Sequence, residues 1–330
     1  MRLQDVKGQQ RVIHALQRSV NTGRVAHAYL FDGIEGCGRR STACALIQVL
    51  FCLQPVAGDA CGVCSSCRKL IAGNHPDLQF LSPLPDKRDI SIEQIRELQQ
   101  VLSLRPFEAR RKACLIEPAE RMNEKSANAL LKTLEEPPGD AILILLTTQP
   151  DLLLSTIRSR CQHLRFSPLD DTVVAELLEQ QGMDRQKAEE LAPLAAGSMQ
   201  YAAQLDADQD QVLRRELLTG LTHASSRSIG SIFDTAETLA GNRDETLKLF
   251  DILTGLLRDL VVLRAAGESG VANKSLIKEL SAESDRFLQV SLMEALELAL
   301  TTRRAVQGNA NPKLSLECFL LGYDRLRKGR

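Results

Sequence analysis

The sequence predicts an α/β domain with a parallel sheet, followed by a region made only of helices. From residue 25 to residue 166, short apolar runs alternate with helical patterns, which is typical of parallel strands joined by crossover helices. After Pro168 only helical periodicity is found, with apolar residues at intervals of three and four. The length of 330 residues also exceeds that of one ordinary domain, so two or three domains are expected.

Five short apolar runs predict the strands of the sheet. They cover residues 27–31, 78–81, 112–116, 141–147 and 163–166. Helical patterns between these runs cover residues 41–51, 92–102 and 124–136. Ser91 and Gln94 have the spacing of a capping box at the start of the second helix. Pro137 and Pro138 are expected to end the third helix, because proline cannot continue one.

The region after the sheet is predicted to contain two helical parts. Residues 170–180 and 184–195 form a small helical unit that ends near Gly197. From residue 209 a separate helical domain is expected, in which a leucine stripe either faces the core or forms a contact with a partner subunit. The stripe consists of Leu249, Leu253, Leu256, Leu257, Leu260 and Leu263. The predicted domains are therefore residues 1–166, 167–208 and 209–330.

Composition narrows the class of protein. With 44% hydrophobic and 25% charged residues, the chain is expected to fold into globular domains. A net charge of −1, with 4% aromatic residues and no Trp, argues against a protein that holds nucleic acid tightly by itself. No apolar stretch approaches the roughly 20 residues that cross a bilayer, and the amino terminus has no signal sequence. We therefore expect no membrane association and a cytoplasmic location.

A glycine-rich segment, residues 33–41, lies where a phosphate-binding loop is expected, between a strand and a helix. Gly33, Gly36 and Gly38 would allow backbone N–H groups to converge on an anion. Arg39, however, replaces the lysine that reaches the β and γ phosphates, and Arg40 replaces the hydroxyl that binds Mg²⁺.

Ser41 follows one residue too late in this loop and, since one helical residue is about 100° of rotation, its hydroxyl is expected to face elsewhere. Three interpretations stay open for the loop. It is a turn without ligand, a nucleotide site without turnover, or a working hydrolytic site.

A second acidic motif is also altered. The strand ending at residue 116 is followed by Glu117 and Pro118, where a hydrolase of this type has an Asp for Mg²⁺ and a Glu that orients water. Proline offers neither acid nor base, so this change is independent of the altered glycine loop. Glu120 is expected to be a surface or helix-start charge. The two motifs together predict that the chain has no ATPase activity of its own.

Four of the nine cysteines have the spacing of a metal site: Cys52, Cys61, Cys64 and Cys67. Zinc fits this pattern, with an iron–sulfur cluster or four unligated thiols as alternatives. Because the protein would fill all four positions of a tetrahedral ion, the zinc would be structural and would hold together an insertion at about residues 52–67.

The segment around Arg160 is predicted to lie at the rim of the sheet, just after the fourth strand. From its position alone, Arg160 is either an ordinary surface charge or an arginine finger that acts on a neighbouring subunit.

Taken together, several segments resemble the bacterial clamp-loader AAA+ family, and most closely its delta prime branch. They are HAYLFDGIEGCGRRS, the cysteine cluster, ISIEQIRELQQVLSLRPFEARRKACLIEPAERMNEKSANALLKTLEEPP, TTQPDLLLSTIRSRC and GSMQYAAQL. The resemblance covers residues 1 to about 205 closely and the remaining helical region loosely. It implies an AAA+ P-loop-type domain with a five-stranded parallel sheet, a zinc-binding insertion, a helical lid and a helical collar domain for oligomerisation.

The resemblance also implies a function and partners. Members of the family form a hetero-oligomeric ring that uses ATP to open the sliding clamp and place it on primed-template DNA. The Ser-Arg-Cys motif matches Ser159, Arg160 and Cys161, so Arg160 would be the finger that reaches the ATP site of an adjacent subunit. The chain would be a non-catalytic part of the DNA polymerase III holoenzyme, with the gamma/tau ATPase and the delta subunit as partners.

The same resemblance assigns roles to other positions. The four cysteines match the zinc-binding insertion of the family. Gln200 stands where the second sensor has an arginine, and Thr147 and Thr148 fall at the first sensor. Retention of ATP or ADP by the altered loop is therefore doubtful.

Two other functions remain as alternatives. The first is a weakly active clamp-loader ATPase of the gamma/tau type. The second is a zinc-dependent nucleic-acid-binding module that would use Arg105, Arg110, Arg111 and Lys112.

Overall fold

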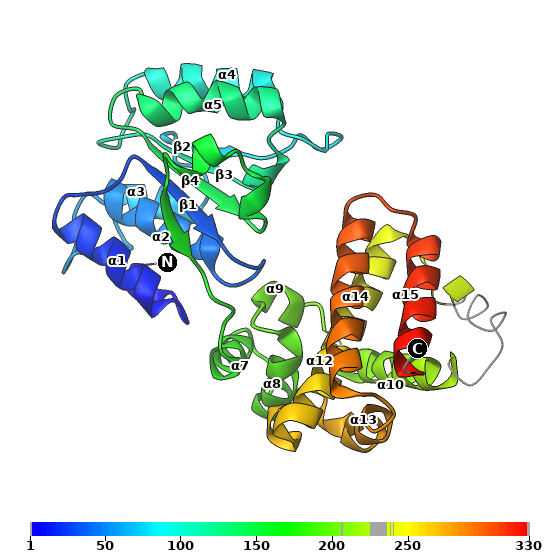
Figure 1. Cartoon of the computed structure of the whole chain (residues 1–330). Coiled ribbons are helices and arrows are strands. Elements are labelled where there is room, and N and C mark those ends of the chain that lie inside the picture. Colours follow the sequence, from blue (N-terminus) through cyan, green and yellow to red (C-terminus); the bar gives the residue numbers. More distant parts are fainter. Residues whose placement is uncertain (1, 206, 225–235, 238, 240, 329–330) are drawn as a thin grey trace. The chain divides into compact units, whose positions relative to one another are not determined.

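A five-stranded parallel sheet forms the centre of the first of two units in the computed structural model, Met1–Gln204 (Figure 1). The structure describes residues 2–205, 207–224, 236–237, 239 and 241–328. The strand order is β2-β3-β4-β1-β5, and every neighbouring pair is parallel. The strands are β1 (Ala28–Asp32), β2 (Leu78–Leu81), β3 (Ala113–Ile116), β4 (Ile142–Thr147) and β5 (Gln162–Arg165).

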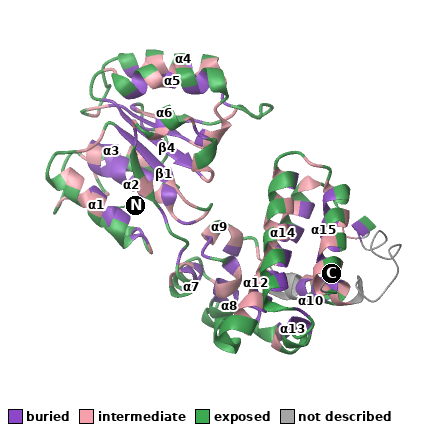
Figure 2. Cartoon of the chain, in the orientation of Figure 1, coloured by how far each residue is buried: buried purple, intermediate pink, exposed green. Residues whose placement is uncertain are grey.

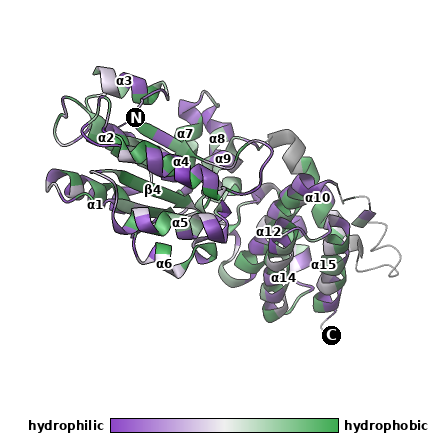
Figure 3. Cartoon of the chain, turned by 90° about the horizontal axis from the view of Figure 1, so that it is seen from above, coloured by the Kyte–Doolittle hydropathy of each residue, from purple (hydrophilic) through white to green (hydrophobic). Residues whose placement is uncertain are grey.

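Helices cover both faces of this sheet, because alternate residues of each strand point to opposite sides. Tyr29 and Phe31 of β1 pack in a core with α1 and α2, whereas Leu30 packs in a second core with α4 and α5. All six residues of β4 are buried, as Figure 2 shows, and Figure 3 shows the hydrophobic colour of this strand. The helices between residue 1 and the end of the sheet are α1 (Gln10–Asn21), α2 (Arg39–Phe51), α3 (Ser65–Ile71), α4 (Ile92–Ser103), α5 (Glu124–Glu135) and α6 (Ser155–Arg158).

Three short helices follow β5 within the same unit: α7 (Asp171–Gln180), α8 (Arg185–Leu191) and α9 (Met199–Ala202). The helix predicted over residues 184–195 is divided, because the turn Ala192–Ala195, which contains Pro193, has 3-10 geometry. The amide of Leu169 donates to the carbonyl of Gly197 at 3.0 Å, which ties the start of this helical segment to the residues just before α9.

The second unit, Leu205–Arg330, consists of helices among its described residues. They are α10 (Ala207–Ala224), α12 (Arg243–Ala266), α13 (Ile277–Ser284), α14 (Gln289–Gln307) and α15 (Pro312–Arg327). The leucine stripe of α12 lies in the core of this unit, with Leu256, Leu257 and Leu260 fully buried. The core-facing interpretation of the stripe is therefore confirmed. No helix in the described part of the chain is long and apolar enough to span a membrane.

The predicted fold class, with five parallel strands followed by helices, is confirmed. The five strands and the helices α2, α4 and α5 lie within two residues of their predicted bounds. The predicted capping box is also present, since the Ser91 hydroxyl accepts from the amide of Gln94 and the Gln94 side chain accepts from the amide of Ser91. Helices α1 and α3 were not predicted. The division of the chain at residues 166 and 208 stays a prediction.

Candidate functional site

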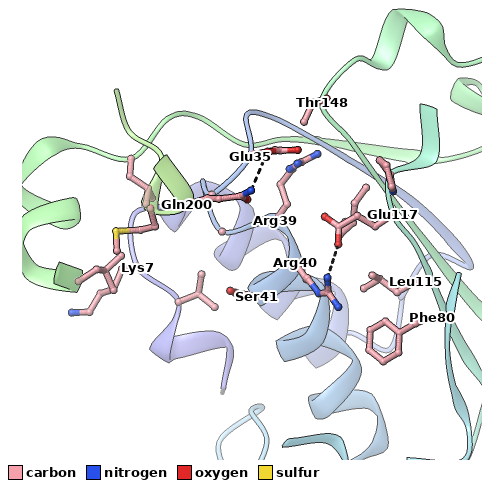
Figure 4. Close-up of a pocket in the computed structure, with 18 of the residues that line it drawn as sticks. Lys7, Glu35, Arg39, Arg40, Ser41, Phe80, Leu115, Glu117, Thr148 and Gln200 are labelled. Carbon is pink, nitrogen blue, oxygen red and sulfur yellow. Dashed lines mark hydrogen bonds and ion pairs between the residues drawn. The ribbon is translucent and has the colours of Figure 1, made fainter. Parts of the chain in front are cut away.

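The glycine-rich loop joins the carboxyl end of β1 to the first turn of α2, as predicted. Gly36 and Gly38 have φ angles of +74° and +99°, in the region that favours glycine. The loop borders a cavity of about 630 Å³ (Figure 4). Gly36, Gly38, Arg39 and Arg40 line it, whereas Gly33 lies at the end of β1, where its amide donates to the carbonyl of Thr147 at 3.3 Å.

Arg39 brings a positive charge to this cavity. Its residue is only 6% exposed, and its Nη1 is buried without a hydrogen-bond partner among the residues that the structure describes. A buried donor without a partner is costly, and an anion in the cavity would satisfy it. This arrangement is consistent with the interpretation that the loop binds nucleotide without turnover.

Arg40 forms an ion pair with Glu117, so the two altered motifs meet in space. Arg40 Nη1 lies 3.3 Å from Glu117 Oε2, and the guanidinium carbon lies 5.6 Å from the centre of the Phe80 ring (Figure 4). Burial raises the pKa of the Glu117 carboxyl, and the charges of Arg40 and Arg39 oppose this effect. A guanidinium of the loop thus pairs with the acidic residue of the second motif, whereas the loss of the water-orienting residue at Pro118 stays a separate predicted change.

Ser41 also lines the cavity. The direction of its hydroxyl, which we expect to face away from a bound metal ion, stays a prediction. Ser41 remains one position beyond the place of the Mg²⁺-binding hydroxyl, which Arg40 occupies.

The helical segment after β5 docks directly on the glycine loop. The amide of Met199, at the start of α9, donates to the carbonyl of Gly36 at 3.1 Å. Gln200 Nε2 donates to Glu35 Oε2 at 3.2 Å, the other dashed contact in Figure 4. A Cβ atom on Gly36 would lie 2.4 Å from the backbone nitrogen of Gln200. The position expected to lack the second sensor arginine thus holds a glutamine that binds the loop itself.

The predicted first-sensor position is also bound from within the chain. The amide and Oγ1 of Thr148 donate to Glu120 Oε1 at 3.1 Å and 2.7 Å. Glu120 lies in the first turn of a short 3-10 helix, as predicted for a helix-start charge, and its side chain also binds Thr148 just after β4. Thr147, the other residue predicted at this sensor, is buried, and its hydroxyl accepts from the amide of Gln149 at 3.0 Å.

The four cysteines of the predicted metal site come together. The sulfur atoms of Cys52, Cys61, Cys64 and Cys67 all lie within 4.8 Å of one another, and those of Cys61 and Cys67 are 4.0 Å apart. Tetrahedral zinc with Zn–S bonds of about 2.3 Å requires sulfur atoms about 3.8 Å apart. Four convergent thiols with this spacing fit a metal ion held entirely by protein ligands.

Backbone amides donate to three of these sulfur atoms. The amides of Cys61, Cys64 and Cys67 lie 3.2, 3.4 and 3.5 Å from the sulfurs of Cys52, Cys61 and Cys64. Desolvation opposes ionisation of Cys64, but bonds from Cys67 and Leu53 outweigh it and lower its pKa to about 6. Burial raises the pKa of Cys67 to about 12. The cluster thus favours thiolate at Cys64, which is the form that binds metal.

The Ser-Arg-Cys motif follows α6 and precedes β5. Cys161 is 9% exposed and packs in the core between the sheet and α5, where burial raises its pKa to about 12. Ser159 donates through Oγ to the carbonyl of Thr156 at 3.1 Å. The side chain of Arg160 is 35% exposed and contacts Glu135. A buried cysteine therefore anchors a segment whose arginine lies at the surface.

Two of the cations proposed for nucleic-acid binding are used inside the chain. Lys112 is 7% exposed and donates to the carbonyl of Val101 at 2.7 Å. Arg111 lies 2.8 Å from Asp140. Only Arg105 and Arg110 of this group are exposed, which weakens the case for a nucleic-acid-binding module.

Sequence reasoning missed the internal partners of the predicted residues. Glu35, Glu120 and Glu135 each bind a residue at a predicted site, but they lie 165, 28 and 25 positions away from that residue. No spacing rule connects residues at such separations, so only the fold could identify them.

A parallel sheet with a glycine-rich phosphate loop after β1, a helical segment docked on that loop and a helical second unit define the AAA+ type of P-loop protein. Two family profiles match the chain: "DNA polymerase III, delta subunit" over residues 8–170, and "DNA polymerase III, delta subunit, C terminal" over residues 209–324. The chain belongs to the family of delta' subunits of bacterial DNA polymerase III, the clamp-loader branch that the sequence motifs indicated.

Named relatives agree with this assignment. The DNA polymerase III subunit delta' of Pseudomonas aeruginosa is 33% identical over 91% of this chain and 92% of its own length. The delta' subunit of Bacillus subtilis is 29% identical over 95% of both chains. The DNA polymerase III subunit tau of Escherichia coli is 30% identical over 98% of this chain, which spans 50% of the length of tau.

Proposed function

We propose that this chain is a non-catalytic subunit of the clamp loader, which scaffolds the ring and supplies Arg160 as a trans arginine finger. The observation that carries this proposal is the contrast between two places in one domain. Arg160 is 35% exposed beside Glu135, on a segment fixed in the core by Cys161, whereas the chain's own loop pairs Arg40 with Glu117. The chain thus offers a cation outward while its own acidic motif is neutralised.

The changes in the loop support the absence of turnover. Mg²⁺ requires oxygen ligands, but the position of its hydroxyl ligand carries the Arg40 guanidinium. This positive charge lies 3.3 Å from Glu117, the acid that would otherwise attract the metal ion. Pro118 replaces the residue that would orient the attacking water. A triphosphate bound here would lack both the metal ion and the activated water.

The partners of the proposal follow from the family. The chain would assemble with the gamma/tau ATPase and the delta subunit, and Arg160 would approach the triphosphate bound by an adjacent gamma/tau subunit. Contact with the sliding clamp would be indirect, and primed-template DNA would lie within the assembled ring. Because the relatives are bacterial replication proteins, the chain would act in the cytoplasm.

The cysteine cluster is proposed to hold one structural zinc ion. All four ligand positions are filled by Cys52, Cys61, Cys64 and Cys67, which leaves no open position for water or substrate. The ion would hold the insertion between α2 and α3 in shape, and no catalytic step is assigned to it.

The finger is tested with Arg160→Ala in a loader assembled from this chain and the gamma/tau and delta subunits of its own organism. Arginine fingers contribute about 10³ to 10⁵ in rate at the site that they complete. The other ATP sites of the ring would keep arginine fingers from other subunits. We therefore expect the ATP turnover that clamp and DNA stimulate to fall but not to disappear. Ring assembly, measured by gel filtration, should be unchanged.

Arg158→Ala is the matched control, because Arg158 belongs to the same segment and pairs with Asp151 at 3.0 Å instead. If the Arg160→Ala and Arg158→Ala loaders turn over ATP equally, the finger assignment is wrong. If the purified chain alone releases phosphate with Mg²⁺, and Glu117→Ala abolishes this release, the chain is instead a weak ATPase of the gamma/tau type.

A further inference from the structure

The guanidinium of Arg160 is held in place by a carboxylate from another helix. We propose that Glu135 is a positioning residue that orients Arg160 toward the triphosphate of the neighbouring subunit. This inference rests on the proposed role of Arg160 as a finger. It adds a second residue to that function and states how the first is kept in its working orientation.

The contacts fix the plane of the guanidinium. Arg160 Nε and Nη2 lie 2.9 and 2.5 Å from Glu135 Oε1, and Nη1 donates to the carbonyl of Thr156 at 3.0 Å. Three nitrogen atoms are therefore bonded. Since a guanidinium has five N–H donors, about two remain for another acceptor. A phosphate oxygen pair can be bound by these two while Glu135 keeps its contact.

Both residues stand next to buried side chains of one core. Leu134, which precedes Glu135, is 1% exposed, and Cys161, which follows Arg160, is 9% exposed. These two neighbours belong to the same hydrophobic cluster between α5, α6 and the sheet. The distance between the backbones of Glu135 and Arg160 is thus set by packing. The ion pair therefore joins two backbone segments that the core holds in fixed positions.

The position of Glu135 is not explained by helix stability. It is the last residue of α5, and Glu136 follows it as the C-cap. A carboxylate at this end of a helix is unfavourable, because the carbonyl groups there already carry partial negative charge. An exposed ion pair also contributes little to folding. A functional partner for Arg160 accounts for a carboxylate at this place.

The exposure of the Arg160–Glu135 pair agrees with a role of Glu135 in orienting Arg160 and not with a role in hiding it from a partner. The side chains of Arg160 and Glu135 are 35% and 51% exposed, so the pair is open to an approaching subunit. Arginine has several rotatable bonds, and holding it in one rotamer removes an entropy loss that would otherwise accompany transition-state binding. We expect loss of Glu135 to lower the turnover of the loader about twofold to fivefold, the range for one exposed ion pair.

The test uses the assembled loader with Glu135→Ala, and with Glu135→Gln as a conservative variant that keeps one carbonyl acceptor. The matched control is Glu136→Ala, which removes an adjacent exposed carboxylate at the same helix end. We expect Glu135→Ala to lower kcat and to leave KM for ATP unchanged, since the residue acts on the transition state through Arg160. Glu135→Gln should restore part of the rate, and Glu136→Ala should have no effect.

A double-mutant cycle separates this inference from the proposed function. In an Arg160→Ala background, Glu135→Ala should cause no further loss. If Arg160→Ala itself has no effect, the finger and the positioning role both fail. If Arg160→Ala lowers turnover but Glu135→Ala matches Glu136→Ala, raises turnover, or acts equally without Arg160, the finger stands and the positioning role is wrong.

Discussion

Replacing Gly36 by alanine tests whether the helical segment after β5 is attached to the phosphate loop without a nucleotide. Gly36 has a φ angle of +74°, and its carbonyl accepts from the amide of Met199. A Cβ atom at this position would lie 2.4 Å from Gln200 N, 2.6 Å from Ser198 Oγ and 2.9 Å from Gln200 Cβ. Ordinary contacts are longer than 3.4 Å, so α9 must move away by about 1 Å.

The cost of this substitution has two parts. A left-handed backbone costs alanine about 1 kcal/mol relative to glycine. Movement of α9 would also break the Met199–Gly36 hydrogen bond, of 3.1 Å, and the Gln200–Glu35 bond, of 3.2 Å. Such bonds contribute about 1 kcal/mol each, less at an exposed position. We therefore expect Gly36→Ala to destabilise the docked segment by about 2–3 kcal/mol.

Gly38→Ala is the matched control. Gly38 also has a left-handed backbone, with φ of +99°, but a Cβ atom there meets nothing within 4 Å. Gly38→Ala therefore has the cost of a left-handed alanine but no steric clash with a neighbouring residue. Amide hydrogen exchange of residues 198–204, measured without nucleotide, should accelerate about fivefold to thirtyfold in Gly36→Ala relative to Gly38→Ala, as a difference of about 1–2 kcal/mol requires.

Two results would refute the reasoning. The first is equal exchange of residues 198–204 in both variants, which would mean that α9 does not rest on Gly36 in solution. The second is rapid exchange of this segment in the unaltered chain, with protection appearing only when nucleotide is added. In that case the ligand, and not the Gly36 carbonyl, holds the segment.

The cysteine cluster should contain close to one zinc ion per chain by elemental analysis, and Cys67→Ser should remove it; iron, or no metal, would contradict the assignment. Because the Cys67 thiol, whose pKa burial raises to about 12, must lose its proton to bind metal, zinc affinity should fall as pH decreases and rise as it increases. In the second unit, Glu283→Gln should lower the free energy of unfolding by about 3–5 kcal/mol, measured by urea denaturation, because it leaves Arg327 unpaired. Glu283 is fully buried and accepts from Tyr323 Oη and Arg327 Nη2 at 3.2 and 3.0 Å; a change below about 1 kcal/mol would show that the pair is not formed.

Those parts of the fold that depend on local pattern were predictable. The first five residues of β4, 142–146, are an unbroken apolar run, and the run is buried on both faces of the sheet. The capping box of α4 and the prolines after α5 depend on neighbouring residues, so they marked helix ends correctly. Helix α1 was missed, although Val12, Ile13 and Leu16 have the spacing of a buried helical face. Helix α1 has 12 residues, the same length as α4 and α5, so its pattern was as informative as those of the predicted helices.

The candidate sites were predictable only where their residues are close in sequence. The cysteines lie within sixteen residues, and their convergence followed from spacing alone. The partners of Arg40, Gln200 and Arg160 depend on how distant elements pack, and the chain contains too many acidic residues for any one to be selected. The sequence thus indicated which residues matter, whereas packing determined what each of them contacts.

The internal contacts of the loop region form a consistent set. Arg40 binds Glu117, Gln200 binds Glu35, and Thr148 binds Glu120. The family resemblance places these positions where a working ATPase of this type would contact the metal ion, the nucleotide or the water. Each of these contacts is here replaced by a bond within the chain. Under the proposed function, a domain whose loop, predicted sensor and helical segment are joined in this way would hold its shape without nucleotide, and it would present Arg160 in one orientation throughout the ATPase cycle of its neighbour.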